Sequence, residues 1–175
     1  MVDRPWKIVV GGNGGVGKTT FINYYVNNVF LPDTKMTIGV QFHMKNVDVK
    51  VGESIVKKDL ILWDLGGQER FRFVLPKYIK GAVAGIVMFD MTRFESLVES
   101  DGWFDLMKEH ASENAPVLLV GTKWDMMESD DVNLVQTMVE EKVEKRGYDG
   151  FAFTSSASGA NVEETMELLI GLLTH

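Results

Sequence analysis

The stretch Gly12–Thr19, which reads GNGGVGKT, most constrains what this chain can fold into. It follows an apolar run, Lys7–Val10, and fits the pattern G-x-x-x-x-G-K-[ST], in which a glycine-rich loop joins a strand to a helix. Glycines let successive backbone N–H groups point at one anion, and the positive end of the following helix strengthens that attraction. A chance glycine-rich turn is the alternative, but the flanking strand and helix disfavour it. The loop therefore predicts a cradle for phosphate groups.

Two side chains at the end of this loop supply the chemistry that a polyphosphate requires. Lys18 can reach the outer phosphates, and the hydroxyl of Thr19 can ligate Mg2+. The backbone N–H groups from Gly14 to Thr19 would hold the phosphate oxygens. A nucleoside polyphosphate with Mg2+ is therefore the expected ligand.

Composition narrows the class of protein that carries this loop. The chain has 175 residues, a formal net charge of −7 and no cysteine. At this length we expect a single domain over residues 1–175, and the negative charge argues against nucleic acid as a partner. The absence of thiols excludes disulfides, thiolate zinc sites and lipid anchors attached to cysteine. Since the longest apolar runs are far too short to span a membrane, we expect a cytoplasmic monomer.

Short apolar runs alternate with helical patterns along the chain. Strands are expected at Ile8–Val10, Phe42–Val51, Ile55–Trp63, Gly85–Phe89, Val117–Val120 and Phe151–Phe153. Helices are expected at Lys18–Asn27, Glu69–Ile79, Phe94–His110, Val132–Arg146 and Val162–Leu173. This alternation predicts an α/β fold, a mostly parallel six-stranded sheet with one antiparallel edge strand and helices on both faces. In such a sheet the ligand lies at the carboxyl ends of the strands.

Asp64 follows one of these strands and begins the sequence DLGGQ. An acidic residue at the carboxyl end of a strand can hold Mg2+ through water beside a phosphate loop. Without that loop, a capping or turn role would be the ordinary interpretation of Asp64. Gly67 gives the backbone room to approach a terminal phosphate, and Gln68 can orient a water molecule for in-line attack. Alone, Gln68 would be a solvated residue at the start of a helix.

The segment Gly121–Asp125, which reads GTKWD, follows another apolar strand and would hold a nucleotide base. The Asp125 carboxylate can accept hydrogen bonds from both the N1–H and the exocyclic amine of guanine. Adenine offers no such pair of donors, and an unpaired buried carboxylate costs about 1 to 3 kcal/mol, so Asp125 would select guanine. Lys123 would lay its alkyl stem over the purine. The small-residue loop Thr154–Gly159 would offer N–H groups to the guanine O6, although alone it is an ordinary turn pattern.

Together these segments resemble the Ras-superfamily small GTPases, and most closely their Rab branch. The likeness covers the whole chain and is strongest in Thr37–Phe42, Trp63–Asp64, Gln68–Arg72 and Tyr78–Ala82. The resemblance implies a molecular switch that binds GTP and GDP with Mg2+. Such a switch hydrolyses GTP to GDP and phosphate, slowly alone and faster with an activating protein. Phe30 matches an aromatic residue that packs against guanine, although it could equally belong to the core.

The resemblance assigns roles residue by residue. Catalysis is implied for Gln68, Lys18 and Gly14, where a side chain at position 14 would obstruct hydrolysis, and metal binding for Thr19, Thr37 and Asp64. No arginine of this chain is marked by these motifs as one that contacts the phosphates. Nucleotide binding is implied for Asn13, Gly14, Gly15, Val16, Gly17, Lys18, Thr19, Thr20, Phe30, Thr37, Gly67, Thr122, Lys123, Asp125, Ser156, Ala157 and Ser158.

Rab proteins bind effectors through an aromatic triad, which falls here on Phe42, Trp63 and Tyr78. Effectors, exchange factors and activating proteins would then contact Thr37–Phe42, Trp63 and Gln68–Tyr78. Alternatively, the three rings simply pack against the sheet. The segment Leu31–Tyr78 would be ordered with GTP and looser with GDP.

The sequence departs from the Rab pattern at three positions in the site. Thr122 stands where an asparagine is usual, and its single hydroxyl cannot both contact the base and tether the phosphate loop. Rho proteins also carry threonine there, so we expect guanine specificity to persist, with roughly fivefold weaker affinity. The family's Ser-Ala-Lys loop is matched by Ser156–Ser158, whereas counting back from Asn161 gives Ser155–Ala157, and both registers remain open. Gly66 replaces the usual alanine, as in Arf and in the fungal septation and mitotic-exit GTPases.

Three further points stay open at the level of sequence. Rab proteins normally end in a cysteine-bearing tail, so either such a tail was removed here or the protein never had one. We expect no direct lipid anchor in these residues, and membrane contact only through partners or an absent tail. A guanine-nucleotide-binding scaffold without turnover is a rival function, which Gln68 disfavours. An ATP-dependent phosphate-loop enzyme is another, which Asp125 disfavours.

Overall fold

A six-stranded sheet forms the centre of the molecule, with its strands in the order β2-β3-β1-β4-β5-β6. The computed structural model describes residues 4–32 and 35–175, so Asp33 and Thr34 of the expected switch segment lie outside the described residues. Only β2 and β3 pair antiparallel, and the other neighbours are parallel. The predicted fold class is confirmed. The strands are β1 (Trp6–Gly11), β2 (Val40–Val51), β3 (Ser54–Leu65), β4 (Ala84–Asp90), β5 (Val117–Thr122) and β6 (Gly150–Phe153).

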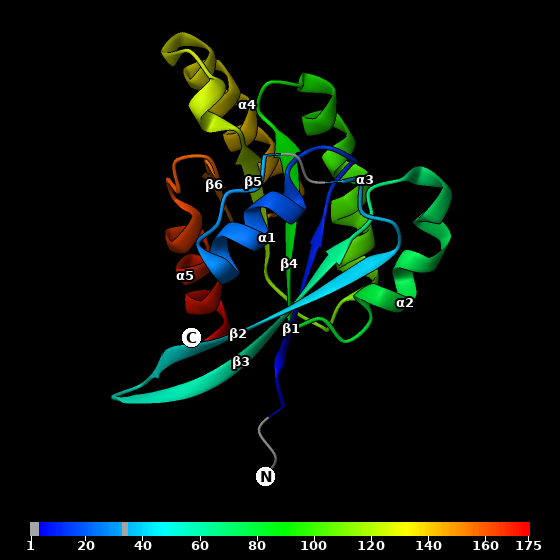
Figure 1. Ribbon diagram of the computed structural model, residues 1–175. Coiled ribbons are helices and arrows are strands. Elements are labelled where there is room, and N and C mark those ends of the chain that lie inside the picture. Colours follow the sequence, from blue (N-terminus) through cyan, green and yellow to red (C-terminus); the bar gives the residue numbers. More distant parts are fainter. Residues whose placement is uncertain (1–3, 33–34) are drawn as a thin grey trace.

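Five α-helices cover the sheet in the described part of the chain (Figure 1). They are α1 (Lys18–Asn27), α2 (Leu75–Ile79), α3 (Phe94–His110), α4 (Ser129–Arg146) and α5 (Val162–Leu173), together with 3-10 helices at Glu69–Val74 and Trp124–Met126. Among the residues described, no helix is both long enough and apolar enough to cross a bilayer.

One helix prediction is wrong in detail. The sequence pattern predicts a continuous helix over Glu69–Ile79, but residues 69–74 form a 3-10 helix and only Leu75–Ile79 is α-helical. Pro76 explains the break, because a proline has no N–H to donate and fits only the first turn of a helix. The α-helical hydrogen bond from residue 76 to the carbonyl of Arg72 therefore cannot form, and α2 begins as a separate helix.

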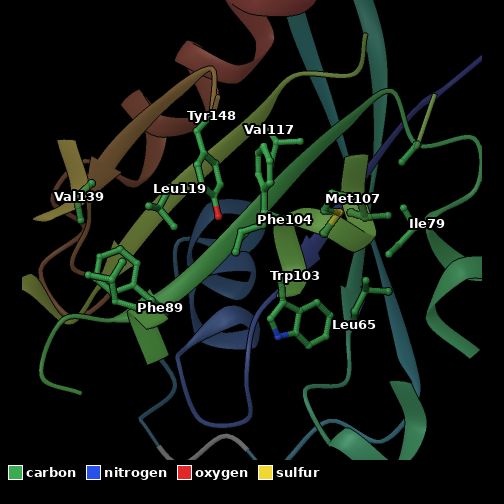
Figure 2. Close-up of a cluster of buried hydrophobic side chains, with 14 of the residues drawn as sticks. Leu65, Ile79, Phe89, Trp103, Phe104, Met107, Val117, Leu119, Val139 and Tyr148 are labelled. Carbon is green, nitrogen blue, oxygen red and sulfur yellow. The ribbon is translucent and has the colours of Figure 1, made fainter. Parts of the chain in front are cut away.

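Alternation along the central strands divides the core into two layers. In β1, Val9 faces the layer that contains α2, α3 and α4, whereas Ile8 and Val10 face the layer that contains α1 and α5. Figure 2 shows the first layer, in which Trp103 and Met107 of α3 pack beside Leu65 and Ile79. Because both faces of these strands are covered, they read as continuous apolar runs.

The antiparallel pair forms a long hairpin at the edge of the sheet. Val51 pairs with Ser54, so the turn between them is Gly52–Glu53, and Gly52 has a φ of 62°. Figure 1 shows the tip of this hairpin reaching beyond the other strands. Its opposite end, near Val40 and Leu65, lies at the carboxyl ends of the parallel strands, where the loops meet.

Candidate functional site

The glycine-rich loop, after β1, borders a pocket of about 190 Å3. The pocket is closed on its other side by residues of the segment before β2 and of the turn after β3. Three segments that are distant in the sequence therefore surround one small volume. Its lining residues are Gly14, Gly15, Gly17, Lys18, Thr19, Lys35, Met36, Thr37 and Gly67.

The carbonyl groups of the glycine-rich loop point at side chains rather than at this pocket. Lys18 Nζ donates to the carbonyls of Gly12 and Asn13, at 2.6 Å and 3.0 Å. Of the next carbonyls, that of Gly14 accepts from Arg93, that of Gly15 from Lys123 and that of Val16 from the Thr122 hydroxyl. Five successive oxygens are thus occupied. Among the loop's N–H groups, that of Val16 bonds the Asn13 carbonyl at 3.4 Å, and the others can turn to an anion.

Lys18 lies almost fully buried at the floor of this pocket, 5% exposed. Burial lowers the pKa of its amine to about 8, while the negative charge of Asp64 opposes the shift and the positive charge of Arg93 adds to it. A buried cation with a lowered pKa gains most from an arriving negative charge. The residue therefore matches the phosphate-binding role that the sequence predicts for it.

Three oxygen-bearing side chains predicted as metal ligands converge beside Lys18. The Thr19 hydroxyl lies 2.8 Å from the Thr37 hydroxyl and donates a hydrogen bond to Asp64 Oδ2. Asp64 is fully buried, and its Oδ1 has no hydrogen-bond partner among the described residues. Burial raises the pKa of Asp64, although hydrogen bonds from Thr19 and Thr37 and the charge of Lys18 oppose the shift. An orphaned buried oxygen of this kind needs a cation or a water.

Two consecutive glycines after β3 let the neighbouring loops approach closely. A Cβ on Gly67 would overlap backbone atoms of Gly12 and Gly14. One on Gly66 would lie 2.8 Å from the Gly39 oxygen and 2.9 Å from the Thr37 oxygen, and the Gly66 N–H bonds the Gly39 carbonyl at 2.7 Å. This spacing leaves no room for the alanine that Rab proteins usually carry at position 66.

A second pocket, of about 230 Å3, adjoins the first at Gly17. Phe30 forms one wall and is 41% exposed, so it belongs to the pocket rim and not to the core. Asp125, which follows β5, is also in the lining. A phosphate-sized space and a base-sized space therefore meet at one residue. The lining of the second pocket is Gly17, Thr20, Phe30, Pro32, Thr122, Lys123, Asp125, Met126, Ser156 and Ala157.

The loop after β6 adopts the second of the two open registers. Ser155, which is buried, donates its hydroxyl to Asp125 Oδ1 at 2.7 Å and accepts the N–H of Ser158. Ser156 and Ala157 line the pocket, whereas Ser158 is not in its lining and uses its N–H inside the turn. This arrangement favours the register Ser155–Ala157, in which Ser155 contacts Asp125 and the next two residues face the pocket.

Thr122 and Lys123 connect the two pockets through the glycine-rich loop. The Thr122 hydroxyl donates to the Val16 carbonyl and lies 3.2 Å from the Phe89 carbonyl, so it is committed to the loop and unavailable as a donor to a base. Lys123 bonds the Gly15 carbonyl at 3.2 Å and the Asp90 carboxylate at 2.6 Å. A residue at position 122 is expected either to contact the base or to tether the glycine-rich loop, and Thr122 tethers the loop.

Two residues predicted to contact the nucleotide direct their side chains elsewhere. Asn13 accepts a hydrogen bond from Trp103 Nε1 at 2.7 Å and donates to Glu99, so its side chain bonds α3 rather than the pocket. The side chain of Val16 is buried in the core beside α1. Any contact from these positions to a ligand would come from the backbone.

Gln68 does not line the phosphate pocket. Its amide donates to the sulfur of Met36, and its Oε1 accepts from Arg70 Nε at 2.8 Å. It lies instead in a neighbouring space of about 370 Å3 with Trp103 and Glu99. A side-chain rotation is therefore required before Gln68 can meet a water molecule at the phosphates.

Sequence reasoning missed three residues of this site, namely Asp90, Arg93 and Trp103, and named Ser155 in only one of the two open registers. Asp90 is buried at the end of β4, where it holds both Lys123 and Arg93. Hydrogen bonds from Lys123 and Thr92 outweigh burial and lower its pKa. An acidic residue ending an apolar strand, the same signal that identified Asp64, could have found it.

The predicted aromatic triad is partly exposed at the surface of β2 and β3. The rings of Phe42 and Trp63 meet edge to face with centroids 4.6 Å apart, and Tyr78 lies 6.2 Å from Trp63. Lys7 covers the Trp63 ring at 3.5 Å. Phe42 is 56% exposed, so packing against the sheet accounts for only part of this cluster.

Comparison with known proteins agrees with this geometry. The Ras family model matches residues 7–174. The chain is 35% identical to rat Ras-related protein Rab-27B, over 95% of this chain and 78% of that protein. It is 34% identical to bovine Ras-related protein Rab-3C (98% and 72%) and 31% identical to Ras-related protein YPTC6 of Chlamydomonas reinhardtii (99% and 77%). The chain therefore belongs to the Ras family, in its Rab branch, and is a small GTPase that binds and hydrolyses GTP.

Proposed function

We propose that this protein is a magnesium-dependent GTP/GDP switch of membrane traffic, in which Thr37 senses the terminal phosphate. The meeting of Thr19, Thr37 and Asp64 at the phosphate pocket carries this proposal. Thr37 belongs to the segment before β2. Its hydroxyl lies beside the Thr19 hydroxyl, which in turn bonds the carboxylate of Asp64 in β3. A ligand that strengthens this junction would hold the segment closed, and its loss would release it.

The residues present fit a magnesium ion. Two hydroxyls and a carboxylate are hard oxygen donors of the kind that Mg2+ prefers, and the orphaned Asp64 Oδ1 would gain a partner through a bound water. When bound, the ion supplies positive charge to the phosphate oxygens. Its charge would also keep Asp64 ionised despite the raised pKa of the free carboxyl.

Hydrolysis would rest on position and electrostatics. Lys18 and the loop N–H groups would hold the phosphates, and the close approach of Gly67 to the loop brings the turn after β3 within reach of the terminal group. Gln68 would leave Met36 and Arg70 to orient the attacking water. Asp125, positioned by Ser155, would select guanine.

Partner binding would use the surface formed by Thr37–Phe42, Trp63 and Gln68–Tyr78, which carries exposed apolar side chains. Within it Ile38 is 67% exposed and Phe73 79% exposed. Large exposed apolar side chains that gather at a segment with two states are suited to a state-dependent partner. We propose that effectors and regulators bind here, and that the protein acts as a cytoplasmic monomer that reaches membranes through partners or a tail.

The nucleotide released on denaturing the purified protein tests the proposal most directly. We expect guanosine diphosphate, and calorimetry should give much tighter binding of GDP than of ADP. Removal of Mg2+ with EDTA should accelerate GDP release. Equal affinity for ADP would favour an ATP-dependent enzyme instead, and a single-turnover assay without phosphate release would favour a scaffold.

Limited proteolysis tests the switch itself. Digestion between Leu31 and Tyr78 should be slower with a non-hydrolysable GTP analogue than with GDP, because Thr37 and Gly67 would contact the terminal phosphate only in the first state. Identical digestion patterns in the two states would contradict the proposal.

A further inference from the structure

Arg93, at the start of α3, extends its side chain over the glycine-rich loop. Its Nη2 donates to the Gly14 carbonyl at 3.2 Å, and the same atom would lie 3.8 Å from a Cβ on Gly15. Gly14 and Gly15 both line the phosphate pocket. The guanidinium therefore lies beside two residues that line the phosphate pocket, on the carbonyl side of the loop, and does not itself line the pocket.

The charge of Arg93 acts on the interior of that pocket. Burial is the main cause of the lowered pKa of Lys18, and the positive charge of Arg93 contributes in the same direction. Two cations of the same chain thus lie near one volume, Lys18 in the lining of the pocket and Arg93 against the carbonyl side of the loop that borders it. Such an arrangement is repulsive by itself and becomes favourable when a polyanion lies between them.

Arg93 can leave its present contacts at little cost. Its side chain is 48% exposed, and its ion pair with Asp90 Oδ2, at 3.3 Å, is longer than the 2.6 Å pair of Lys123 with the same oxygen. Thr92 supplies two more hydrogen bonds to Asp90 Oδ1. Departure of Arg93 would therefore not leave the buried Asp90 carboxylate unpaired, and the exposed Gly14 carbonyl could bond water instead.

We propose that Arg93 turns from the Gly14 carbonyl to the terminal phosphates of bound GTP and supplies, within this chain, an arginine that stabilises the transition state of hydrolysis. The inference rests on the proposed role of the glycine-rich loop as the phosphate site. In the reaction a water oxygen bonds to the γ-phosphorus, and the bond from that phosphorus to the β–γ bridging oxygen breaks with its electron pair on GDP. The water protons leave on inorganic phosphate. Arg93 keeps its own proton and stabilises the charge that develops on the bridging and γ oxygens.

A structural role for Arg93 makes a different prediction. If the residue only braces the loop at Gly14, its loss would weaken binding of GDP and GTP together with the rate of hydrolysis. A residue that contacts the transition state changes the rate of the chemical step and leaves GDP affinity nearly unchanged. Rate and affinity must therefore be measured on the same variants.

Single-turnover GTP hydrolysis by the chain alone, without an activating protein, tests the inference. We expect Arg93→Ala to be about 100-fold slower than wild type, with GDP affinity within about threefold. Arg93→Lys should stay well below wild type, because an ammonium cannot reproduce the two-pronged contact of a guanidinium. The matched control is Arg4→Ala, an exposed arginine before β1, at the end of that strand opposite the loop, and this variant should hydrolyse GTP normally.

Binding of GDP with aluminium fluoride, a transition-state analogue, gives a second readout. Wild type should bind the analogue without any partner, and Arg93→Ala should lose this binding while retaining GDP. Hydrolysis by Arg93→Ala within twofold of wild type would overturn the proposed role of Arg93 but not the proposed function. A parallel loss of GDP affinity would have the same consequence. Failure of wild type to bind GTP would instead overturn the proposed function and this inference with it.

Discussion

The glycine-rich loop and two switch segments, residues 35–39 before β2 and residues 66–74 after β3, meet at the same pocket but are stabilised in different ways. Each carbonyl from Gly12 to Val16 is bonded by a side chain, the first two by Lys18 of the loop itself and the others by residues distant in sequence, and the Asn13 side chain is bonded to Trp103. The switch segments, by contrast, present Ile38 and Phe73 to solvent. The loop is therefore a preorganised binding element, whereas the switch segments keep exposed apolar side chains that a partner could cover.

The contrast indicates how one small protein can bind tightly and still change shape. Hydrogen bonds from α1, β5, α3 and their adjoining loops fix the anion site before a ligand arrives, so little ordering is needed there. The binding energy of the terminal phosphate is then available to hold Thr37 and Gly67. If this interpretation is right, substitutions in the loop and in the residues that bond it should change nucleotide affinity. Substitutions where the loop meets the switch segments should change the rate of GTP hydrolysis.

Asp125→Asn should produce the largest effect, because it alters the base pocket without touching the switch segments. An amide cannot accept both guanine donors, so GTP affinity should fall roughly 100-fold and xanthosine triphosphate should bind better than GTP. Competition with a fluorescent nucleotide measures both affinities. Glu128→Gln, an exposed acidic residue nearby and outside the pocket lining, serves as the control. An unchanged preference for GTP would refute the assigned role of Asp125.

Gly14→Val tests the junction of the two regions. Among the residues that the structure describes, a Cβ at this position would meet only the Met36 methyl, at 4.0 Å, so the fold should tolerate the substitution. The valine would still occupy the space into which Gln68 must turn, and hydrolysis should fall at least about tenfold with GDP binding retained. Single-turnover rates and urea denaturation should be measured together. Undiminished turnover would mean that Gln68 reaches the phosphates by another route.

A pair of serine variants sharpens the account of the base loop. Ser155→Ala removes the hydroxyl that holds Asp125, so GDP affinity should fall about tenfold. Ser158→Ala should stay within about twofold of wild type, because that side chain does not line the pocket. Calorimetry with GDP compares the two, and the reverse ranking would restore the register Ser156–Ser158.

Thr122→Asn should give a smaller change in the opposite direction. An amide could bond the Val16 carbonyl, as the hydroxyl does, and also reach the base, so GDP should bind about fivefold more tightly. Thr122→Val is the matched variant, since it keeps the shape and leaves the Val16 carbonyl without this donor. Thr122→Asn with no gain in GDP affinity would show that the threonine loses nothing at the base.

The smallest expected signal is a proton taken up by Lys18. Its pKa of about 8 in the free protein should rise towards the ordinary lysine value when phosphate charge arrives, so binding must take up protons near pH 8. We expect uptake of about half a proton at pH 8 and nearly none at pH 6.5. Calorimetry of GDP binding in buffers with different ionisation enthalpies measures the uptake. Zero uptake at pH 8 would mean that the amine is already fully charged.

The elements near the pockets could be predicted well from sequence because local signals specify them. Lys18 begins α1 where the glycine pattern places the helix start, and the apolar runs of β4 and β5 appear where expected. The predicted helix over Glu69–Ile79 is too long, because helical periodicity extends across Pro76. The residues of the glycine-rich loop could also be predicted, since they form one contiguous sequence pattern.

The remainder of the site depends on contacts between distant segments. The direction of the Asn13 side chain is set by Trp103, and the contact of Arg93 with Gly14 joins two loops far apart in the sequence. Nothing in a linear pattern encodes such pairs. The register at Ser155 was ambiguous for a related reason, because three small polar residues look alike until Asp125 selects one of them.

The missing methyl group at Gly66 has an evolutionary consequence. The Thr37 and Gly39 oxygens occupy the volume that an alanine would need. A lineage with this geometry could accept alanine at 66 only if the backbone of residues 37–39 shifted in the same step. Positions 66 and 37–39 should therefore drift as a coupled set among descendants of this gene, and ancestral reconstruction would reveal one rarely changing without the other.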